Sequence, residues 1–518
     1  MKKIQTLAAL SAISLLLAGC GGSGSDSGSS STTAGYYATK TAYKPQQDAS
    51  SYEAAPAGFS PVYVELVARH GSRGLSSMKY DDAVLNMWKK AKADNALTTL
   101  GAQLGPDVEK IMKANFLLGY GVSGISSPGY GNLTQVGITE HQELAKRMMS
   151  RMSSLFAALK TGAKTSPRTI DVMNSGQDRA VDSSQFFANA IATQAPELAG
   201  TITTPPTIDR YQLYFHKLGS SDQVTDSSSI NYTVYQNSQA YQAFDAATDA
   251  GGYGTEVTAK IDAVRALDAN KVAARTVLER LFTKEFVDKI DNGTYSFANN
   301  GSYTYNSADG KFTSTLTGNG KTKIKSMVDA AQLIYELYII SPSMKNETGV
   351  DFNQYVPATQ AKTFAYLQDI EDFYKKGPSA TEYNGIAYNM ALGLQRDFFD
   401  EVSRIASGDL TRAARLRFAH AETIIPFAAI MGVPGAATPV ARAQTYSYDN
   451  NSWRGDTVSP MAANMQWDVY RNASGKVLVK MLYNEKETDF KPACDSARYA
   501  SGSRFYDFQK LKACYLGN

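Results

Sequence analysis

The fold is decided by residues 61–73, which read PVYVELVARHGSR. Residues 61–68 form a short apolar run rich in β-branched side chains, and such a run is typical of a buried strand. The run leads directly into Arg69, His70 and Gly71. Because α/β sheets bind ligands beyond the carboxyl ends of their strands, this stretch predicts an α/β fold with reactive side chains at one edge of its sheet.

Two further stretches repeat this arrangement. Residues 167–173 (PRTIDVM) predict a strand that precedes the polar sequence NSGQDR at residues 174–179. Residues 416–419 (LRFA) predict a third strand, which runs into HAE at residues 420–422. Three strands therefore end in polar residues capable of chemistry, and a helical pattern follows each of them.

Helices are predicted over much of the remaining chain. A pattern of apolar residues that starts with Thr139 as a helix cap continues to Leu159. Further helical patterns cover residues 258–290, 323–340 and 386–405. Residues 292–322 contain Asn-Gly and Asp-Gly pairs beside alternating stretches, which predict a β-hairpin.

These patterns predict a core interrupted by an insertion. We expect an α/β core, with a mostly parallel sheet flanked by helices, over residues 58–200 and 378–518. Residues 201–377 are mainly helical and predict an inserted cap domain that includes the hairpin.

The first 20 residues resemble a bacterial lipoprotein signal. Two lysines precede the apolar run of residues 7–18, which is shorter than the about 20 residues needed to span a bilayer. Small residues then precede Cys20, so we expect cleavage before Cys20 and lipidation of its thiol. The alternative is an ordinary signal peptide with a chance cysteine.

A polar segment follows the signal. Residues 21–35 are almost entirely Gly, Ser and Thr, and we expect a flexible tether over residues 21–57. The expected product is an exported protein anchored by lipid to the cell envelope. Gly21 after the cysteine resembles lipoproteins sent to the outer membrane, with the periplasmic or surface face left open.

The composition of the chain limits the kinds of binding partner that we expect. A formal charge of +3 is nearly balanced and does not suggest nucleic-acid binding. Cys494 and Cys514 favour a disulfide over a metal site in an exported protein, because no histidine lies close to them in sequence. No metal or organic cofactor is implied, and the oligomeric state is left open.

The residue types in RHGSR, residues 69–73, suit phosphoryl transfer. Arginine forks match phosphate oxygens, and two nearby guanidinium groups lower the pKa of a histidine and favour neutral imidazole. A neutral His70 has the lone pair needed to attack phosphorus, with charge stabilisation from Arg69 and Arg73 instead of a metal. The alternative is a solvent-exposed basic turn.

The ordered motifs resemble the histidine phosphatase superfamily. Its signature is Arg-His-Gly-x-Arg after a buried strand, and residues 131–137 (GNLTQVG) are similar to the family segment that leads into a helix. Residues 178–187 resemble the stretch that carries a third phosphate-binding arginine, here Arg179. Residues 420–427 (HAETIIPF) and the run from 477 to 494 are similar to the acid phosphatase branch. The resemblance covers nearly all of the chain after residue 60.

Two positions depart from that branch. Ala421 stands where most members have the proton-donating Asp, and Glu422 follows it. The version HAET resembles the multiple inositol polyphosphate phosphatases, which implies that Glu422 is the proton donor. Leu75 replaces a usual proline in the loop that leads to Lys79, a possible substrate-binding residue.

The resemblance implies a mechanism. We expect Arg69, Arg73, Arg179 and His420 to bind the phosphate, His70 to attack it and Glu422 to protonate the leaving alcohol. That acid role requires a raised pKa for Glu422, to which the substrate phosphate would contribute.

Several functions remain open at this point. The expected substrates are inositol polyphosphates such as phytate, and the alternatives are a broad acid or sugar-phosphate phosphatase, a mutase, or a non-catalytic binding lipoprotein. His141 is interpreted as a surface or core histidine, not a ligand, and His216 gives no indication of a role. The cap cations Lys260, Arg265, Lys271, Arg275 and Arg280 are interpreted as solvated helix charges, and the alternative is that they line a pocket for a highly charged substrate.

Overall fold

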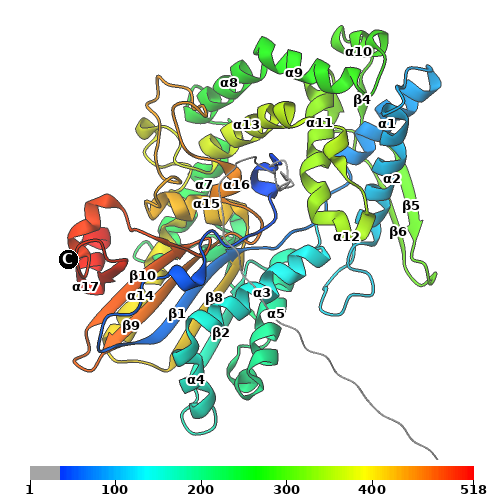
Figure 1. Ribbon diagram of the computed structural model, residues 1–518. Helices are drawn as coiled ribbons and strands as arrows, with labels where there is room; N and C mark the ends of the chain where they lie inside the picture. Colours follow the sequence, from blue (N-terminus) through cyan, green and yellow to red (C-terminus); the bar gives the residue numbers. More distant parts are fainter. Residues whose placement is uncertain (1–34, 518) are drawn as a thin grey trace, which may run out of the picture. The chain divides into compact units, whose positions relative to one another are not determined.

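A central sheet of eight strands organises the computed structural model, which describes residues 35–517 (Figure 1). Its main path has the order β11-β10-β9-β1-β8-β2-β3, and β12 also pairs with β10. The strands are β1 Phe59–Arg69, β2 Thr169–Asn174, β3 Thr207–Ile208, β8 Arg412–Ala419, β9 Asn464–Asn472, β10 Val477–Tyr483, β11 Lys486–Thr488 and β12 Phe505–Asp507.

The strand directions confirm the predicted fold class. β1, β8, β2 and β3 are parallel to one another, whereas β9 is antiparallel to both β1 and β10. β10 therefore runs in the direction of β1, and only β9, β11 and β12 run the other way among the strands of this sheet. The fold is α/β with a mostly parallel sheet.

The three predicted strand-and-motif units lie side by side. β1 pairs with β8, and β8 pairs with β2, so that Arg69 is opposite Ala419 and Asn174 is opposite Phe418. Because these strands are parallel, the residues that follow them emerge at the same edge of the sheet.

Helices cover both faces of the sheet (Figure 1). Alternation along β1 places Val64, Leu66 and Ala68 in one apolar cluster, and Tyr63 and Val67 in the other. The first cluster includes side chains of α3 Gln135–Arg151, α4 Ser153–Gly162 and α5 Asp178–Gln194. The second includes side chains of α14 Leu392–Ala406, α15 Ala421–Ile430 and α17 Phe508–Leu516.

Helix α3 begins earlier than the predicted cap at Thr139. Thr134 is the N-cap, with an extended backbone, and its side chain accepts a hydrogen bond from the N–H of Gly137. A threonine at this position satisfies a backbone donor that the helix itself leaves unpaired. Thr139 lies inside the helix, and its hydroxyl donates to the carbonyl oxygen of Gln135.

The insertion is mainly helical, with one projecting hairpin (Figure 1). The hairpin expected within residues 292–322 is formed by β5 Ser302–Asn306 and β6 Thr313–Thr317, which are antiparallel. The main helices are α7 Ile230–Asp245, α8 Tyr253–Arg265, α9 Asp268–Glu279, α10 Lys284–Asp291, α11 Met327–Ile340, α12 Lys345–Thr348 and α13 Ala358–Lys375.

The helical layer also contains a part of the chain that we assigned to the core. Helices α1 Tyr80–Ala93 and α2 Gly101–Leu117 lie beside α11 and α12 (Figure 1). The N–H of Thr98, between them, donates to the carbonyl oxygen of Leu281 at 3.0 Å, and Asn86 Nδ2 donates to that of Ala298 at 2.9 Å. Residues 80–117 therefore pack with the inserted helices, and their assignment to the core within residues 58–200 is wrong.

The expected tether over residues 21–57 is wrong for its second half. Tyr43 donates its N–H to Glu140 Oε1 at 2.8 Å and its hydroxyl to Glu485 Oε2 at 2.9 Å. Farther along, Lys480 Nζ donates to the carbonyl oxygen of Glu53 at 3.1 Å. The Gly/Ser/Thr composition ends at residue 35, and the tyrosines that follow supply apolar surface that can be buried. The predicted signal, Cys20 and residues 21–34 lie outside the described residues.

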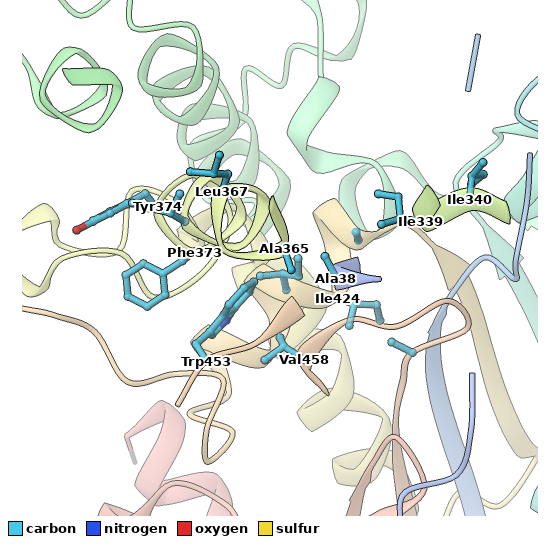
Figure 2. Close-up of a cluster of buried hydrophobic side chains, with 14 of the residues drawn as sticks. Ala38, Ile339, Ile340, Ala365, Leu367, Phe373, Tyr374, Ile424, Trp453 and Val458 are labelled. Atoms are coloured by element: carbon cyan, nitrogen blue, oxygen red, sulfur yellow. The ribbon is translucent and has the colours of Figure 1, made fainter. Parts of the chain in front are cut away.

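The packed N-terminal segment reaches the junction of cap and core. Figure 2 shows Ala38 near Ile339 of α11, Ala365 of α13 and Ile424 of α15. These side chains belong to one continuous apolar cluster, so the cap and the core share buried surface. The described residues form a single compact unit.

Two further features concern the predicted envelope protein. Cys494 and Cys514 form the expected disulfide, with Cα atoms 5.7 Å apart, and it links the turn Pro492–Ala497 to α17. Among the described residues, no helix has both the length and the apolar character needed to cross a bilayer.

Candidate active site

The loop after β1 holds His70 in one orientation. The N–H of His70 donates to the carbonyl oxygen of Ala419 at 2.9 Å, which fixes the loop to β8. His70 Nδ1 lies 2.9 Å from the carbonyl oxygen of Gly71. Because a carbonyl oxygen only accepts, Nδ1 carries the proton, and Nε2 keeps the lone pair.

Close contact with α3 requires glycine beside the histidine. A Cβ atom on Gly71 would lie 2.5 Å from the carbonyl oxygen of Gly137, in the first turn of α3. The next residue is clamped from the same helix, because buried Glu140 accepts from the N–H of Ser72 at 2.6 Å and from its hydroxyl at 2.8 Å. The loop is therefore held rigidly against α3.

Three arginines line the same cavity as His70. They are Arg69, Arg73 and Arg179, and the Nε of each is buried without a hydrogen-bond partner in the described part of the chain. Arg69 Nη1 donates to the carbonyl oxygens of Thr39 and Ser459, the latter at 2.6 Å, and these hydrogen bonds fix the orientation of the guanidinium group. Unpaired guanidinium donors around a histidine form a ready site for phosphate oxygens.

The arginines also set the charge of His70. Burial, followed by repulsion from Arg179, Arg69 and Arg73, holds the pKa of His70 well below its usual range. Burial and mutual repulsion lower the pKa of Arg73 to about 9 and that of Arg69 to about 10, which leaves both groups charged at neutral pH. The site therefore combines a neutral imidazole with cationic guanidinium groups.

His420 lies next to His70 at the sheet edge. The ring centroids of the two histidines are 5.5 Å apart, and His420 Nε2 lies 2.8 Å from Ser175 Oγ, which follows β2. Its Nδ1 is buried without a partner among the described residues. Burial and Arg179 hold the pKa of His420 well below its usual range, against the opposing effect of Glu422.

Glu422 lies in the first turn of α15 and is paired with a cation. Its Oε1 is 3.2 Å from Lys376 Nζ, and Lys376 is also 2.8 Å from Asp372 Oδ1. Burial alone would raise the pKa of Glu422, but Lys376, His216 and His420 hold it well below its usual range. The free site therefore keeps Glu422 ionised, whereas the expected acid role requires the protonated form.

A cavity of about 480 Å³ connects these groups. Its lining includes Arg69, His70, Arg73, Arg179 and Glu422, so the structure brings these predicted residues together, with His420 adjoining them. Lys79 does not line the cavity; its Nζ lies 5.9 Å from the ring centre of Tyr80. The lining also includes the charged residues Lys40, Lys217, Asp245, Arg265, Glu336, Glu371, Asp372, Lys375 and Lys376.

Several lining residues escaped the sequence analysis. His216, to which we assigned no role, lines the cavity with its ring centroid 6.2 Å from that of His420. Arg265 also lines it, whereas Arg275 pairs with Glu279 on the same helix. The position of His216 shortly after the strand β3 could have indicated a role at the sheet edge. That strand has only two residues, however, and is too short to be recognised in the sequence.

His141 agrees with its structural interpretation. It is fully buried in α3, its ring centroid lies 5.5 Å from that of Phe418, and neither ring nitrogen has a hydrogen-bond partner among the described residues. Within residues 35–517, no group of three or more His, Cys, Asp or Glu side chains is arranged to hold a metal ion.

A neutral histidine at the end of a parallel strand, held among arginines that have no carboxylate partner within residues 35–517, defines the class of histidine-type phosphatases. The model of the histidine phosphatase superfamily, branch 2, matches residues 62–484. The chain belongs to this family and is a histidine-type phosphatase.

Solved structures show which members of the family are similar to this chain. The multiple inositol polyphosphate phosphatase of Bifidobacterium longum, in complex with inositol hexasulfate, is 34% identical, with a TM-score of 0.79, over 93% of this chain and 97% of that chain. Its apo form matches with a TM-score of 0.80 and the same coverage. A phytase from D. castellii shares the fold at 12% identity, with a TM-score of 0.58, over 93% of this chain and 84% of that chain.

A curated human protein matches over a shorter stretch. Multiple inositol polyphosphate phosphatase 1 of Homo sapiens is 26% identical over 136 residues. The match spans 24% of this chain and 27% of the human protein.

Proposed function

We propose that the protein hydrolyses inositol polyphosphates, phytate foremost, through a phosphohistidine on His70. The observation that carries the proposal is the neutral His70, with its Nε2 lone pair, among Arg69, Arg73 and Arg179. The similarity to the B. longum enzyme over nearly the whole chain supports the substrate class.

The proposed reaction has two steps. In the first, His70 Nε2 attacks phosphorus, a P–N bond forms, and the bond from phosphorus to the inositol oxygen breaks. The leaving oxygen takes a proton from Glu422. In the second step, water attacks the phosphohistidine, Glu422 takes up a proton, and the P–N bond breaks to release inorganic phosphate. The arginines and His420 stabilise the charge on the phosphoryl oxygens throughout.

Substrate binding favours protonation of Glu422, which is ionised in the free site and takes its proton from solvent. A phosphate dianion beside Glu422 raises the pKa of that carboxyl by like-charge repulsion. The same dianion attracts Lys376, which weakens the ion pair that keeps Glu422 ionised. Glu422 thus takes up a proton as the substrate binds.

The cavity lining supports a substrate with several phosphates. Beyond the three arginines, it includes the cations Lys40, Lys217, Arg265, Lys375 and Lys376. One phosphate needs only a few of these charges, so a ligand with several phosphates would use more of them. A broad acid or sugar-phosphate phosphatase is the alternative that the experiment must separate.

The test is phosphate release from phytate and from 4-nitrophenyl phosphate by a chain that begins at residue 21, beside its His70→Ala variant. We expect release from both substrates, a higher kcat/KM on phytate, and no release by the variant. A neutral-pH quench followed by mass spectrometry should detect the phosphate on His70. Cleavage of the aryl phosphate alone would refute phytate as substrate, and an active His70→Ala variant would refute the nucleophile.

We also propose the cellular placement from the sequence alone. The signal-like residues 1–20 support lipidation at Cys20 and attachment to the cell envelope, with the outer membrane as the expected site. Labelling with a fatty acid, followed by membrane fractionation, tests this placement. Equal labelling of a Cys20→Ala variant would contradict it.

A further inference from the structure

The N-terminal segment is fixed against the phosphate site. The carbonyl oxygen of Thr39 accepts from Arg69 Nη1, and that of Thr41 accepts from the N–H of Met461 at 2.9 Å. The short helix η1 Ala38–Lys40, which contains Thr39, lies among α11, α13 and α16 Gly455–Val458 (Figure 1). Ala38 is buried at this junction (Figure 2). The backbone that carries Lys40 is therefore held on both sides.

Lys40 lines the cavity without an ion-pair partner. Three other cavity cations, all from the cap side, have carboxylates: Arg265 lies 3.1 Å from Glu371, Lys375 lies 3.6 Å from Asp245, and Lys376 lies 2.8 Å from Asp372. No carboxylate oxygen lies within 4.0 Å of Lys40 Nζ in the described part of the chain. A cation kept inside a cavity without a partner is costly unless a ligand supplies the charge.

The neighbours of Lys40 reinforce this argument. Burial, then repulsion from Arg73 and Arg69, lowers the pKa of Lys40 to about 7, while Glu336 of α11 and Asp372 of α13 oppose the shift. Lys40 therefore lies between the arginines of the core and the carboxylates of the cap. An anion bound there would relieve the repulsion among three cations.

We propose that Lys40 binds a second phosphate group of the substrate, one that stays on the ring while the phosphate at His70 is removed. This inference rests on the proposed function for its substrate class. The reacting phosphate already has three guanidinium groups and His420, whereas Lys40 lines the same cavity together with Glu336 of α11 and Asp372 of α13. The N-terminal segment is thus part of the binding site for a polyphosphorylated ligand and contributes to its specificity.

The test compares binding of inositol hexasulfate and inorganic phosphate by titration calorimetry. The variants are Lys40→Met, which keeps length and removes charge, and Lys40→Arg, which restores charge. Lys44→Met is the matched control, because Lys44 is exposed on the same segment. We expect Lys40→Met to weaken hexasulfate binding by about tenfold and phosphate binding by less than about twofold, as for the loss of one charge-assisted contact. Lys40→Arg should recover most of the loss, and Lys44→Met should change neither ligand.

The outcomes separate the roles of Lys40. An equal loss for both ligands would place Lys40 at the reacting phosphate and overturn the proposal, as would no loss for either. If Lys40→Met fails to fold, Lys40→Gln serves the same comparison. Hexasulfate binding without phytate hydrolysis by the unmodified protein would refute the proposed function, whereas a selective loss of hexasulfate binding in Lys40→Met would still assign Lys40 to a second anionic group of the ligand. Absence of hexasulfate binding by the unmodified protein would overturn the inference itself.

Discussion

Lys376 and Glu422 form an ion pair across the junction of cap and core, with Nζ 3.2 Å from Oε1. Lys376 directly follows α13 of the cap, and Glu422 lies in the first turn of α15 in the core. The protonation state of Glu422, the expected proton donor in the core, therefore depends on a residue of the cap.

Replacing Lys376 should move the pH profile. Lys376 lowers the pKa of Glu422, so its removal raises that pKa and keeps the carboxyl protonated to higher pH. We expect Lys376→Met to shift the descending limb of kcat/KM against pH to higher pH by about one unit or more. The measurement is a pH series with 4-nitrophenyl phosphate. Lys362→Met, on the exposed side of α13, is the control, and an unmoved limb in Lys376→Met would contradict the role of the ion pair.

Loss of one arginine should impair every phosphate ester. Arg179 has no ion-pair partner in the described chain and contributes strongly to the charge around His70 and His420. We expect Arg179→Met to reduce kcat/KM by about 10²–10³, because preorganised charge stabilisation is lost. Initial rates on phytate and an aryl phosphate measure the effect. Arg275→Met on the cap surface should stay near the parent rate, and a similar fall there would point to general destabilisation.

Glu140 should couple stability to the loop that carries His70. Its carboxylate accepts from the N–H and hydroxyl of Ser72 and from the N–H of Tyr43. Glu140→Ala leaves these buried donors unpaired, so we expect a loss of about 2–4 kcal/mol in the free energy of unfolding. Denaturant titration measures it, with Glu143→Ala on the surface of the same helix as control. Equal stability of the two variants would show that the clamp contributes nothing.

Removing the packed N-terminal segment should damage the enzyme. A chain that begins at residue 58 lacks Thr39, whose carbonyl oxygen holds Arg69, and also lacks Tyr43. We expect a lower midpoint of thermal unfolding than for a chain that begins at residue 35, and a kcat/KM reduced by at least about tenfold. Calorimetry and initial rates compare the two chains. Identical behaviour would restore the interpretation of residues 36–57 as a passive tether.

Local sequence patterns predicted the centre of the site well. Each of β1, β2 and β8 combines an apolar strand with a polar motif, and both features lie within about ten consecutive residues. Parallel pairing of these strands then brings His70 and His420 to one edge without further information.

Contacts between distant segments could not be predicted in this way. Lys40 and Lys376 come from segments without a motif, and only the packing of α11 and α13 on the N-terminal segment places them in the cavity. The ionised state of Glu422 depends on Lys376, so no reading of HAET alone could supply it. The amphipathic patterns of α1 and α2 likewise did not indicate whether these helices pack against the core or against the cap, because that depends on contacts with distant segments.

The position of β1 in the sheet has a consequence for synthesis of the chain. β1 is the first strand made, yet its two neighbours are β8 and β9, which begin at Arg412 and Asn464. The buried pair Glu65 and Arg417 is separated by 352 residues in sequence. Such long-range pairing closes large loops and is slow to form. Most of the chain must therefore leave the ribosome before His70 and His420 can meet. A chain that terminates anywhere before β8 lacks His420 and is therefore expected to be inactive.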